Sequence, residues 1–183
     1  MICIIYSNVM ALKTILTEPN KILRQKSIKV DVVDKDLQVL MDDMLQTMYA
    51  APGIGLAAIQ IGIPKRVIVI DISRDPEEKK PFFFVNPEII YKSNNSLVYE
   101  EGCLSVPGQF AEISRPEECK VKYLDYYGKS QEMMAKGLLA TCIQHEIDHL
   151  EGILFIDHLS WLKKTSIVKK LQKQQKALER IVV

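Results

Sequence analysis

The sequence predicts an α+β fold in which antiparallel strands pack around a buried helix, with a further helix at the C-terminal end. Its 183 residues have the length of one domain, and an apolar fraction of 48% is enough to form a core. Apolar residues recur at helical spacing in three segments, and one of these, residues 138–150, is apolar nearly all round, as buried helices are. Short strand-like runs separated by turn residues lie between the helical segments. We therefore expect residues 1–183 to form a single domain.

The N-terminal segment, residues 1–9, is apolar but has neither the basic region nor the small-residue cleavage site of a signal peptide. It is also too short to cross a bilayer, so we expect no membrane contact. Met10-Ala11-Leu12-Lys13 has the pattern of a second translation start. Residues 1–9 are therefore predicted to be a dispensable extension.

The first helix is predicted over residues 34–49. Asp34 or Asp36 provides an N-cap, and Pro52-Gly53 follows the end of the helix. Its apolar positions recur at helical spacing: Leu37, Leu40, Met41, Met44, Leu45 and Met48.

Strands are predicted where residues alternate in polarity or form short apolar runs. The predicted strands are 66–71, 82–85, 88–91 and 119–124. Turn residues interrupt them at Asn86-Pro87, 93–96 and 125–129.

Two helices follow. The buried one, residues 138–150, ends at Gly152. Ser160 then caps a last helix, so that residues 160–183 form a basic C-terminal helix. Its apolar stripe, under a lysine-rich face, consists of Trp161, Ile167, Val168, Leu171 and Leu178.

The charge is unevenly distributed. The formal net charge is +1, which gives the whole chain no strong field for nucleic acid or membrane. Residues 160–183, however, carry seven basic residues and one acidic residue, so their net charge is +6 and that of the remainder is −5. Four cysteines without paired spacing argue against a disulfide framework and favour a reducing cytoplasm.

The sequence His145-Glu146-Ile147-Asp148-His149 is an HExxH motif. Two histidines four residues apart differ by about 40° around a helix and can close on one metal ion. Glu146 lies beside them, where it can act on a water bound to the metal. Catalytic sites of this kind have three protein ligands and keep a fourth position for water.

The third ligand distinguishes the classes of metal site. A metzincin would place a histidine at Phe155, which cannot bind metal, and Glu151 lies too close to His149 for a thermolysin-like site. Cys103, in Glu101-Gly102-Cys103-Leu104-Ser105, offers a thiolate that suits Zn²⁺ or Fe²⁺.

Two other interpretations stay open at this point. A zinc endopeptidase would cleave internal peptide bonds, and Phe155 argues against it. A non-catalytic, metal-stabilised binding module would need four protein ligands, for which His158 is the only other histidine.

Three motifs together resemble the peptide deformylase family, in its bacterial type 1 form. They occur in the family's order and at compatible spacings, and the resemblance covers roughly residues 11–175. The motifs are Gly53-Ile54-Gly55-Leu56-Ala57-Ala58-Ile59-Gln60, Glu101-Gly102-Cys103-Leu104-Ser105 and His145-Glu146-Ile147-Asp148-His149-Leu150-Glu151-Gly152.

The resemblance implies a metal-dependent hydrolase that removes the N-formyl group from formyl-methionine at the start of nascent peptides and releases formate. Cys103, His145 and His149 would hold the metal, and Glu146 would be the general base. The Leu104 backbone N–H and the Gln60 side-chain amide would stabilise the oxyanion.

Further roles follow from the same resemblance. Gly55 would pair its backbone with the substrate. Glu101 would pair with Arg115 and brace the Cys103 loop. Fe²⁺ is implied as the native metal, whereas Zn²⁺, Ni²⁺ or Co²⁺ would also fit. The basic C-terminal helix would contact the ribosome, and a monomer is expected.

A methionine side chain needs an apolar pocket. Helical spacing places Leu138, Thr141 and Cys142 on the His145 side of their helix, and Ile54 and Tyr99 are predicted to complete the pocket. Phe110 departs from the family pattern, whose best-known members carry arginine seven residues after the ligand cysteine. The substrate preference beyond the first residue is therefore not carried over.

Overall fold

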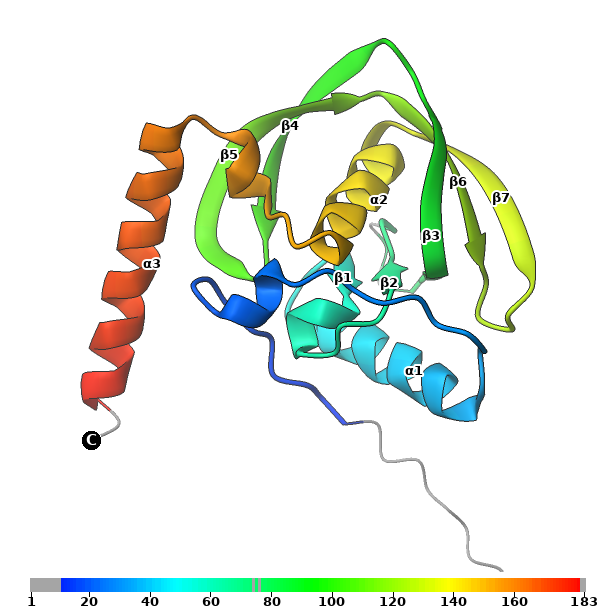
Figure 1. Cartoon of the computed structure of the whole chain (residues 1–183), viewed down its shortest axis with the longest axis horizontal. Helices are drawn as coiled ribbons and strands as arrows, with labels where there is room; N and C mark the ends of the chain where they lie inside the picture. The colour runs from blue at the N-terminus through cyan, green and yellow to red at the C-terminus, as the bar shows by residue number, and fades with distance from the viewer. Residues whose placement is uncertain (1–10, 74, 76, 182–183) are drawn as a thin grey trace, which may run out of the picture.

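The computed structural model describes residues 11–73, 75 and 77–181. Its secondary structure comprises seven strands, three α-helices and three 3₁₀ helices within that range (Figure 1). The fold is α+β with a C-terminal helix, as predicted. Residues 1–9, predicted to be a dispensable extension, lie outside the described residues.

A five-stranded antiparallel sheet forms one half of the core. Its strands lie in the order β1-β2-β3-β6-β7. Their bounds are Gly55–Ala57 for β1, Val67–Ile70 for β2, Phe82–Lys92 for β3, Glu118–Leu124 for β6 and Ser130–Lys136 for β7. All four residues of β2 are buried, which explains its uninterrupted apolar sequence.

Strand β3 differs from the prediction of two short strands on either side of Asn86-Pro87. It is one strand with shifts in its pairing to β6 between Val85 and Glu88 and again between Ile89 and Tyr91. Asn86 has a φ of 51° at the first of these shifts. Its side chain accepts a hydrogen bond from the Val30 N–H and donates one to the Val30 carbonyl. The turn residues therefore mark a β-bulge rather than a break.

A second sheet is the hairpin of β4 (Ser96–Cys103) and β5 (Val106–Pro116). Neither strand was predicted from the sequence. The hairpin lies across α2 from β3, β6 and β7, so the helix is flanked by strands on both sides (Figure 1).

Helix α2 (Gly137–Leu150) is buried at the centre of this arrangement, as its apolar sequence predicted. Its residues Ala140, Ile143 and Leu150 pack with Phe84 and Val121 of the larger sheet. Helix α1 (Lys35–Ala50) is capped by Asp34, whose side chain accepts from the Leu37 N–H. It covers the other face of β1 and β2 with its methionines.

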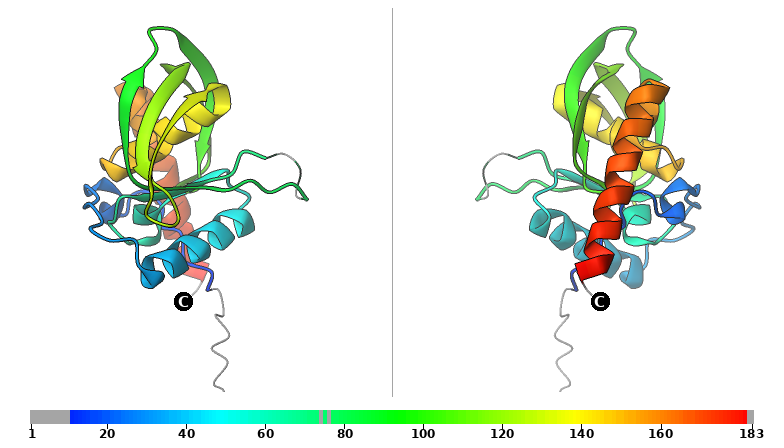
Figure 2. Two further views of the ribbon diagram at one scale, coloured as in Figure 1. Left: turned by 90° about the vertical axis from the view of Figure 1, so that its right-hand side faces the viewer. Right: turned by 90° about the vertical axis from the view of Figure 1, so that its left-hand side faces the viewer.

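Helix α3 (Trp161–Ile181) packs beside the β4–β5 hairpin (Figures 1 and 2). Leu171 is buried against Val106, Ile113 and Phe155. A 3₁₀ helix, η3 (Phe155–His158), joins α2 to α3, and its Asp157 binds Lys164 at 2.6 Å. Two other 3₁₀ helices are η1 (Lys21–Arg24) and η2 (Ala58–Ile61).

None of the helices in the described part of the chain combines the length and the apolar composition needed to span a membrane.

Candidate active site

Helix α2 brings His145, Glu146 and His149 to one buried face. All three residues are less than a tenth exposed. The imidazole of His145 is stacked on Phe155 at a centroid distance of 6.3 Å. Phe155, at the position of a metzincin ligand, therefore packs against a histidine instead of binding metal.

Cys103 reaches the same point from the end of β4. Its Sγ lies 3.2 Å from Nε2 of His149, and one potential ligand atom from each of Cys103, His145 and His149 lies within 4.8 Å of the others. Ordinary zinc bond lengths of about 2.0–2.3 Å place the donor atoms of a tetrahedral site roughly 3.5 Å apart. The thiolate and two imidazoles therefore fit a single divalent cation.

The ionisation of His149 suits a metal ligand. Burial, together with the positive charges of His145 and Arg115, holds its pKa well below the ordinary value. The imidazole therefore stays neutral and keeps a lone pair for a metal.

The other histidine, His145, is oriented by Glu101. Nδ1 of His145 lies 2.8 Å from Oε2 of Glu101, which leaves Nε2 free to face Cys103 and His149. Burial alone would raise the pKa of Glu101, but hydrogen bonds from His145 and Arg115 outweigh it and lower the pKa to about 2. Glu101 is therefore a fixed anion behind the histidine, the arrangement that orients metal ligands.

Arg115 holds Glu101 from the other side. Its Nε donates to Oε1 of Glu101 at 2.5 Å and its Nη2 to Oε2 at 3.0 Å. Its Nη1 donates to Asp148 at 2.8 Å, so one buried guanidinium joins the β4–β5 hairpin to α2. The Glu101–Arg115 contact was expected, whereas Asp148 was not singled out. Its position inside the HExxH motif was the available signal.

Glu146 points into a cavity between α2 and β1. Its side chain is buried, and its Oε2 has no hydrogen-bond partner among the described residues. Burial raises the pKa of its carboxyl group to about 7. A Cβ atom at Gly55 would collide with Oε1 of Glu146, so the carboxylate has room only because residue 55 is glycine.

Gln60 is fixed in one orientation. Its Oε1 accepts from the Ala57 N–H at 2.8 Å, and its Nε2 lies 3.0 Å from Oγ of Ser105 and 3.5 Å from Sγ of Cys103. The amide N–H group therefore faces the candidate metal centre. Ser105 was not predicted as a partner, although it lies in the same motif as Cys103.

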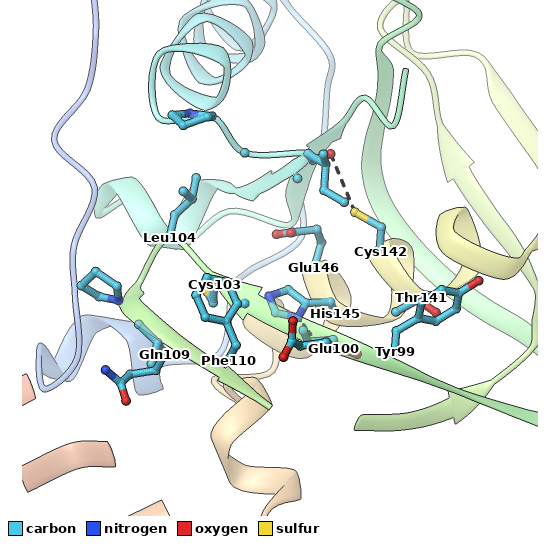
Figure 3. A pocket seen from close by; sticks show the side chains of 18 of the residues that line it. Tyr99, Glu100, Cys103, Leu104, Gln109, Phe110, Thr141, Cys142, His145 and Glu146 are labelled. Atoms are coloured by element: carbon cyan, nitrogen blue, oxygen red, sulfur yellow. Dashed lines mark hydrogen bonds and ion pairs between the residues drawn. The ribbon is translucent and has the colours of Figure 1, made fainter. Parts of the chain in front are cut away.

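A cavity of about 470 Å³ opens beside these groups. All the residues predicted to bind the substrate line it, together with Leu104 (Figure 3). They are Ile54, Gly55, Tyr99, Leu138, Thr141 and Cys142. The cavity also extends along Pro107 to Phe110, of which only Phe110 was singled out from the sequence.

The residues of the alternative interpretations are engaged elsewhere. Nε2 of His158 lies 2.7 Å from Asp148, outside the group of metal-binding atoms. Glu151 binds Arg66 at 2.6 Å and Lys26 at 3.3 Å. Within the described part of the chain, no fourth protein ligand joins Cys103, His145 and His149.

The fold and site define a metallohydrolase, with a Cys-His₂ group that could hold a metal ion and a glutamate on the HExxH helix. The family model described as polypeptide deformylase matches residues 12–165. The chain belongs to the peptide deformylase family, and its function is to remove the N-formyl group from the formyl-methionine of newly made polypeptides.

Individual relatives agree with this assignment. The peptide deformylase of Pelagibacter ubique is 68% identical over 164 residues, which cover 90% of this chain and 95% of that protein. A crystal structure of peptide deformylase from Ehrlichia chaffeensis superposes with a TM-score of 0.87 at 39% identity, covering 91% of this chain and 98% of the other. A complex of the Ehrlichia chaffeensis enzyme with actinonin has a TM-score of 0.86 at 41% identity, with coverages of 90% and 98%.

Proposed function

We propose that Cys103, His145 and His149 hold the catalytic metal and that Glu146 is the general base of the deformylation. The observation that carries this proposal is the convergence of the three ligand atoms within 4.8 Å, beside a buried carboxylate with one unpaired oxygen. A divalent cation bound by these ligands supplies the Lewis acidity that makes water nucleophilic near neutral pH.

Glu146 moves the protons. Its carboxylate accepts a proton from the attacking water, whose oxygen forms a bond to the formyl carbon. The carbon–nitrogen bond then breaks, and Glu146 passes the proton to the departing amine. The products are formate and a peptide with a free N-terminus. Burial of Glu146 supports this role, because a pKa of about 7 lets the carboxyl group both accept and return a proton.

Gln60 and Leu104 stabilise the oxyanion. The oxygen of the formyl group gains negative charge as water adds, and donors fixed in advance lower the energy of that state. The Gln60 amide is suited to this because the Ala57 N–H holds its oxygen and turns the nitrogen towards Cys103. The second donor is the backbone N–H of Leu104, which follows the cysteine.

The cavity walls position the substrate. Gly55 lies in the short edge strand β1 and pairs its backbone with the extended peptide. The methionine side chain enters the lobe lined by Ile54, Tyr99, Leu138, Thr141 and Cys142. Glu146 lies so close to Gly55 that little space remains beside the carboxylate. This limited space favours the small formyl group over larger acyl groups.

Glu101 and Arg115 brace the site. Their buried pair fixes His145 through its Nδ1 and ties the Cys103 strand to α2 through Asp148. These two residues act on the ligands and do not touch the substrate.

The assignment is tested by formate release from a formyl-methionyl peptide, with protein purified anaerobically in Fe²⁺. Glu146→Gln should keep the metal and lose turnover, because the shape is retained and the base is lost. Cys103→Ala should lose metal and turnover together. Normal turnover by Glu146→Gln, or full metal content in Cys103→Ala, would remove the corresponding role.

Fe²⁺ is proposed as the native metal. The thiolate and two imidazoles also accept Zn²⁺, Ni²⁺ and Co²⁺, so the ligands alone do not select one ion. Elemental analysis of anaerobically purified protein tests this choice. The metal-free protein, reconstituted with each ion in turn, should be most active with Fe²⁺ and should lose that activity in air.

We propose that α3 contacts the ribosome. Exposed lysines on this helix, Lys169, Lys170, Lys173 and Lys176, suit contact with RNA phosphates. Lys173→Glu/Lys176→Glu should weaken ribosome co-sedimentation at low salt, whereas Lys29→Glu/Lys35→Glu, with the same charge change elsewhere, should not.

A cytoplasmic monomer is proposed. Cys103, Cys119 and Cys142 are free thiols in the structure, which suits a reducing compartment. Light scattering during size-exclusion chromatography should give the mass of one chain.

A further inference from the structure

The loop between α1 and β1 forms one wall of the cavity, and Asp71 holds this loop at both ends. The loop starts at Tyr49, in the last turn of α1, and the cavity is lined by its later residues Pro52, Gly53 and Ile54. The Tyr49 hydroxyl donates to Oδ2 of Asp71 at 2.5 Å. At the other end, the Asp71 N–H donates to the Ile54 carbonyl at 2.9 Å. A single residue that follows β2 therefore closes the 49–54 loop.

The bond to the Ile54 carbonyl sets the direction of the next residue, Gly55. Gly55 pairs with Ile70 of β2, and β1 lies at the end of its sheet, so its other edge has no partner strand among the described residues. Backbone groups of successive residues in a strand point to opposite edges. Because the Ile54 carbonyl points to β2, the N–H and carbonyl of Gly55 point to the free edge, where the peptide is proposed to pair.

A second contact to the same carbonyl is weaker. Sγ of Cys142 lies 3.8 Å from the Ile54 oxygen, as the dashed line in Figure 3 marks. A thiol is a poor hydrogen-bond donor, so the bond from Asp71 is the stronger restraint on Ile54.

Asp71 is a rigid anchor because both oxygens of its carboxylate are bonded. The residue is only 4% exposed. Its Oδ1 accepts from the N–H and the hydroxyl of Ser73 at 2.9 and 2.5 Å, and its Oδ2 also accepts from the Lys80 N–H at 3.1 Å. Burial raises the pKa of Asp71, but the hydrogen bonds from Ser73 and Tyr49 outweigh burial and hold it below the ordinary value. An ionised acceptor strengthens the bond from Tyr49.

Tyr49 ties the end of α1 to this anchor without reaching the substrate. Neither Tyr49 nor Asp71 is among the residues that line the cavity. Nζ of Lys79 lies 4.2 Å from the centroid of the Tyr49 ring, so a cation packs on the ring while its hydroxyl is bonded to Asp71. The pair can therefore act on the substrate only through the 49–54 loop and Gly55.

We propose that Tyr49 and Asp71 are positioning residues for substrate binding. Their hydrogen bond holds the 49–54 loop and the start of β1 so that the Gly55 backbone meets the backbone of the peptide. The pair contributes to binding and takes no part in breaking the carbon–nitrogen bond. This inference rests on the proposed function, in which Gly55 pairs with the substrate.

Tyr49→Phe tests the pair because it keeps the ring and removes only the hydroxyl. KM for formyl-methionyl-alanyl-serine should rise about fivefold while kcat stays within about twofold of the wild type, the pattern of lost substrate binding. Acetohydroxamic acid binds a metal but has no peptide backbone, so its inhibition constant should not change. The metal content should also stay the same.

Asp71→Asn weakens the same hydrogen bond from the other partner, because the acceptor loses its charge. It should raise KM by a similar factor and also lower stability, since Ser73 and Lys80 donate to the same carboxylate. If both residues act through one bond, Tyr49→Phe/Asp71→Asn should raise KM no more than the larger single effect, whereas independent effects would multiply.

Tyr126→Phe is a matched control. The Tyr126 hydroxyl donates to Oδ2 of Asp42 at 3.0 Å, and Asp42 lies on α1, so this variant also removes a tyrosine–aspartate bond that holds the helix. Tyr126 is not among the residues that line the cavity. Both KM and kcat should stay at the wild-type values.

Hydrogen exchange measures the same restraint without turnover. In the protein without substrate, the backbone amides of residues 51–57 should exchange faster in Tyr49→Phe than in the wild type, because the loop has lost one of its two attachments to Asp71. Exchange in this segment should not change in Tyr126→Phe.

An unchanged KM for the tripeptide in Tyr49→Phe would overturn the proposal. So would a loss of kcat together with weaker inhibition by acetohydroxamic acid, because the effect would then lie at the metal and not at the peptide backbone. Release of no formate by the wild type would instead contradict the proposed function.

Discussion

Residue 55 must be glycine because of the side chains that lie next to it. The space where a side chain at residue 55 would lie is filled by Glu146 and Cys142. The Sγ of Cys142 would lie 3.0 Å from an added Cβ. Gly55→Ala should therefore displace the carboxylate and lower kcat/KM about 100-fold, the usual effect of misplacing a reacting group by about 1 Å. Steady-state kinetics and metal analysis check this, and the metal content should be unchanged.

Gly128→Ala is a control that should lower stability without lowering activity. Gly128 has a φ of 77° in the turn between β6 and β7, where an added Cβ would meet Val33. Alanine there costs about 1–2 kcal/mol of folding free energy, yet formate release should stay at the wild-type rate. Equal kinetic losses in both variants would show that Gly55→Ala acts through stability alone.

Substitution of Arg115 tests whether the Glu101–Arg115 pair holds the proposed metal ligands in position. Arg115→Met leaves the Glu101 carboxylate buried without its cation, and such a loss destabilises by roughly 3–5 kcal/mol. Urea unfolding should show this cost, and metal should dissociate faster because His145 is held less firmly. Adding Glu101→Leu should recover stability but not metal retention. Recovery of both stability and metal retention would show that the Glu101–Arg115 pair stabilises the fold without holding the metal ligands.

At the scale of secondary-structure elements, the helices were predictable and several strands were not. Helix α1 has its cap and its apolar stripe in the sequence, and α2 has nearly continuous apolar residues. Strand β7 contains glutamate, methionine, alanine and lysine, which favour helices. It becomes a strand through its turn and its pairing with β6.

The β4–β5 hairpin could not be predicted from the sequence for a related reason. Its sequence includes Glu100, Glu101, Gly102, Pro107 and Gly108, all residue types that are rare in strands. Glu101 is there to orient His145, and Gly102 makes room for Phe110. The needs of the site thus override the usual strand pattern.

The attachment of α3 can be tested through Asp157. This carboxylate accepts from the Leu154 N–H at 2.8 Å and pairs with Lys164 and Arg24. Burial raises its pKa, but these contacts outweigh burial and hold the pKa below the ordinary value of 3.8. A depressed pKa means that the contacts stabilise the fold above pH 3.8 and are lost as the pH falls through the lower folded value.

Asp157→Asn should therefore remove about 1 kcal/mol of stability at neutral pH and make the remaining stability less dependent on pH below 4. Hydrogen exchange should be faster in the first turns of α3, which the pair with Lys164 holds against η3. Unchanged exchange there would mean that Leu171 and the other apolar contacts alone attach the helix.

At the scale of the whole molecule, the site lies where two sheets meet one helix. The two histidines and the glutamate were predictable because they share one helical turn. The distance between Cys103 and His149 was not, because 46 residues separate them and only the tertiary fold brings them together. For the same reason Ser105 and Asp148, which support Gln60 and Arg115, were found only in the structure.

A metal held by the ligands proposed above would cross-link the β4–β5 hairpin and α2. A ligand that binds the folded chain alone adds stability in proportion to the logarithm of its concentration relative to Kd. Removing the metal with a chelator under anaerobic conditions should lower the Tm by about 10 °C, and restoring Fe²⁺ or Zn²⁺ should recover it. Calorimetry measures the shift. Cys103→Ser should unfold at the lower temperature with or without chelator, because the ion has lost its ligand on the hairpin. A wild-type Tm that does not respond to the chelator, although the metal has left, would mean that the Glu101–Arg115–Asp148 contacts hold the two parts together unaided.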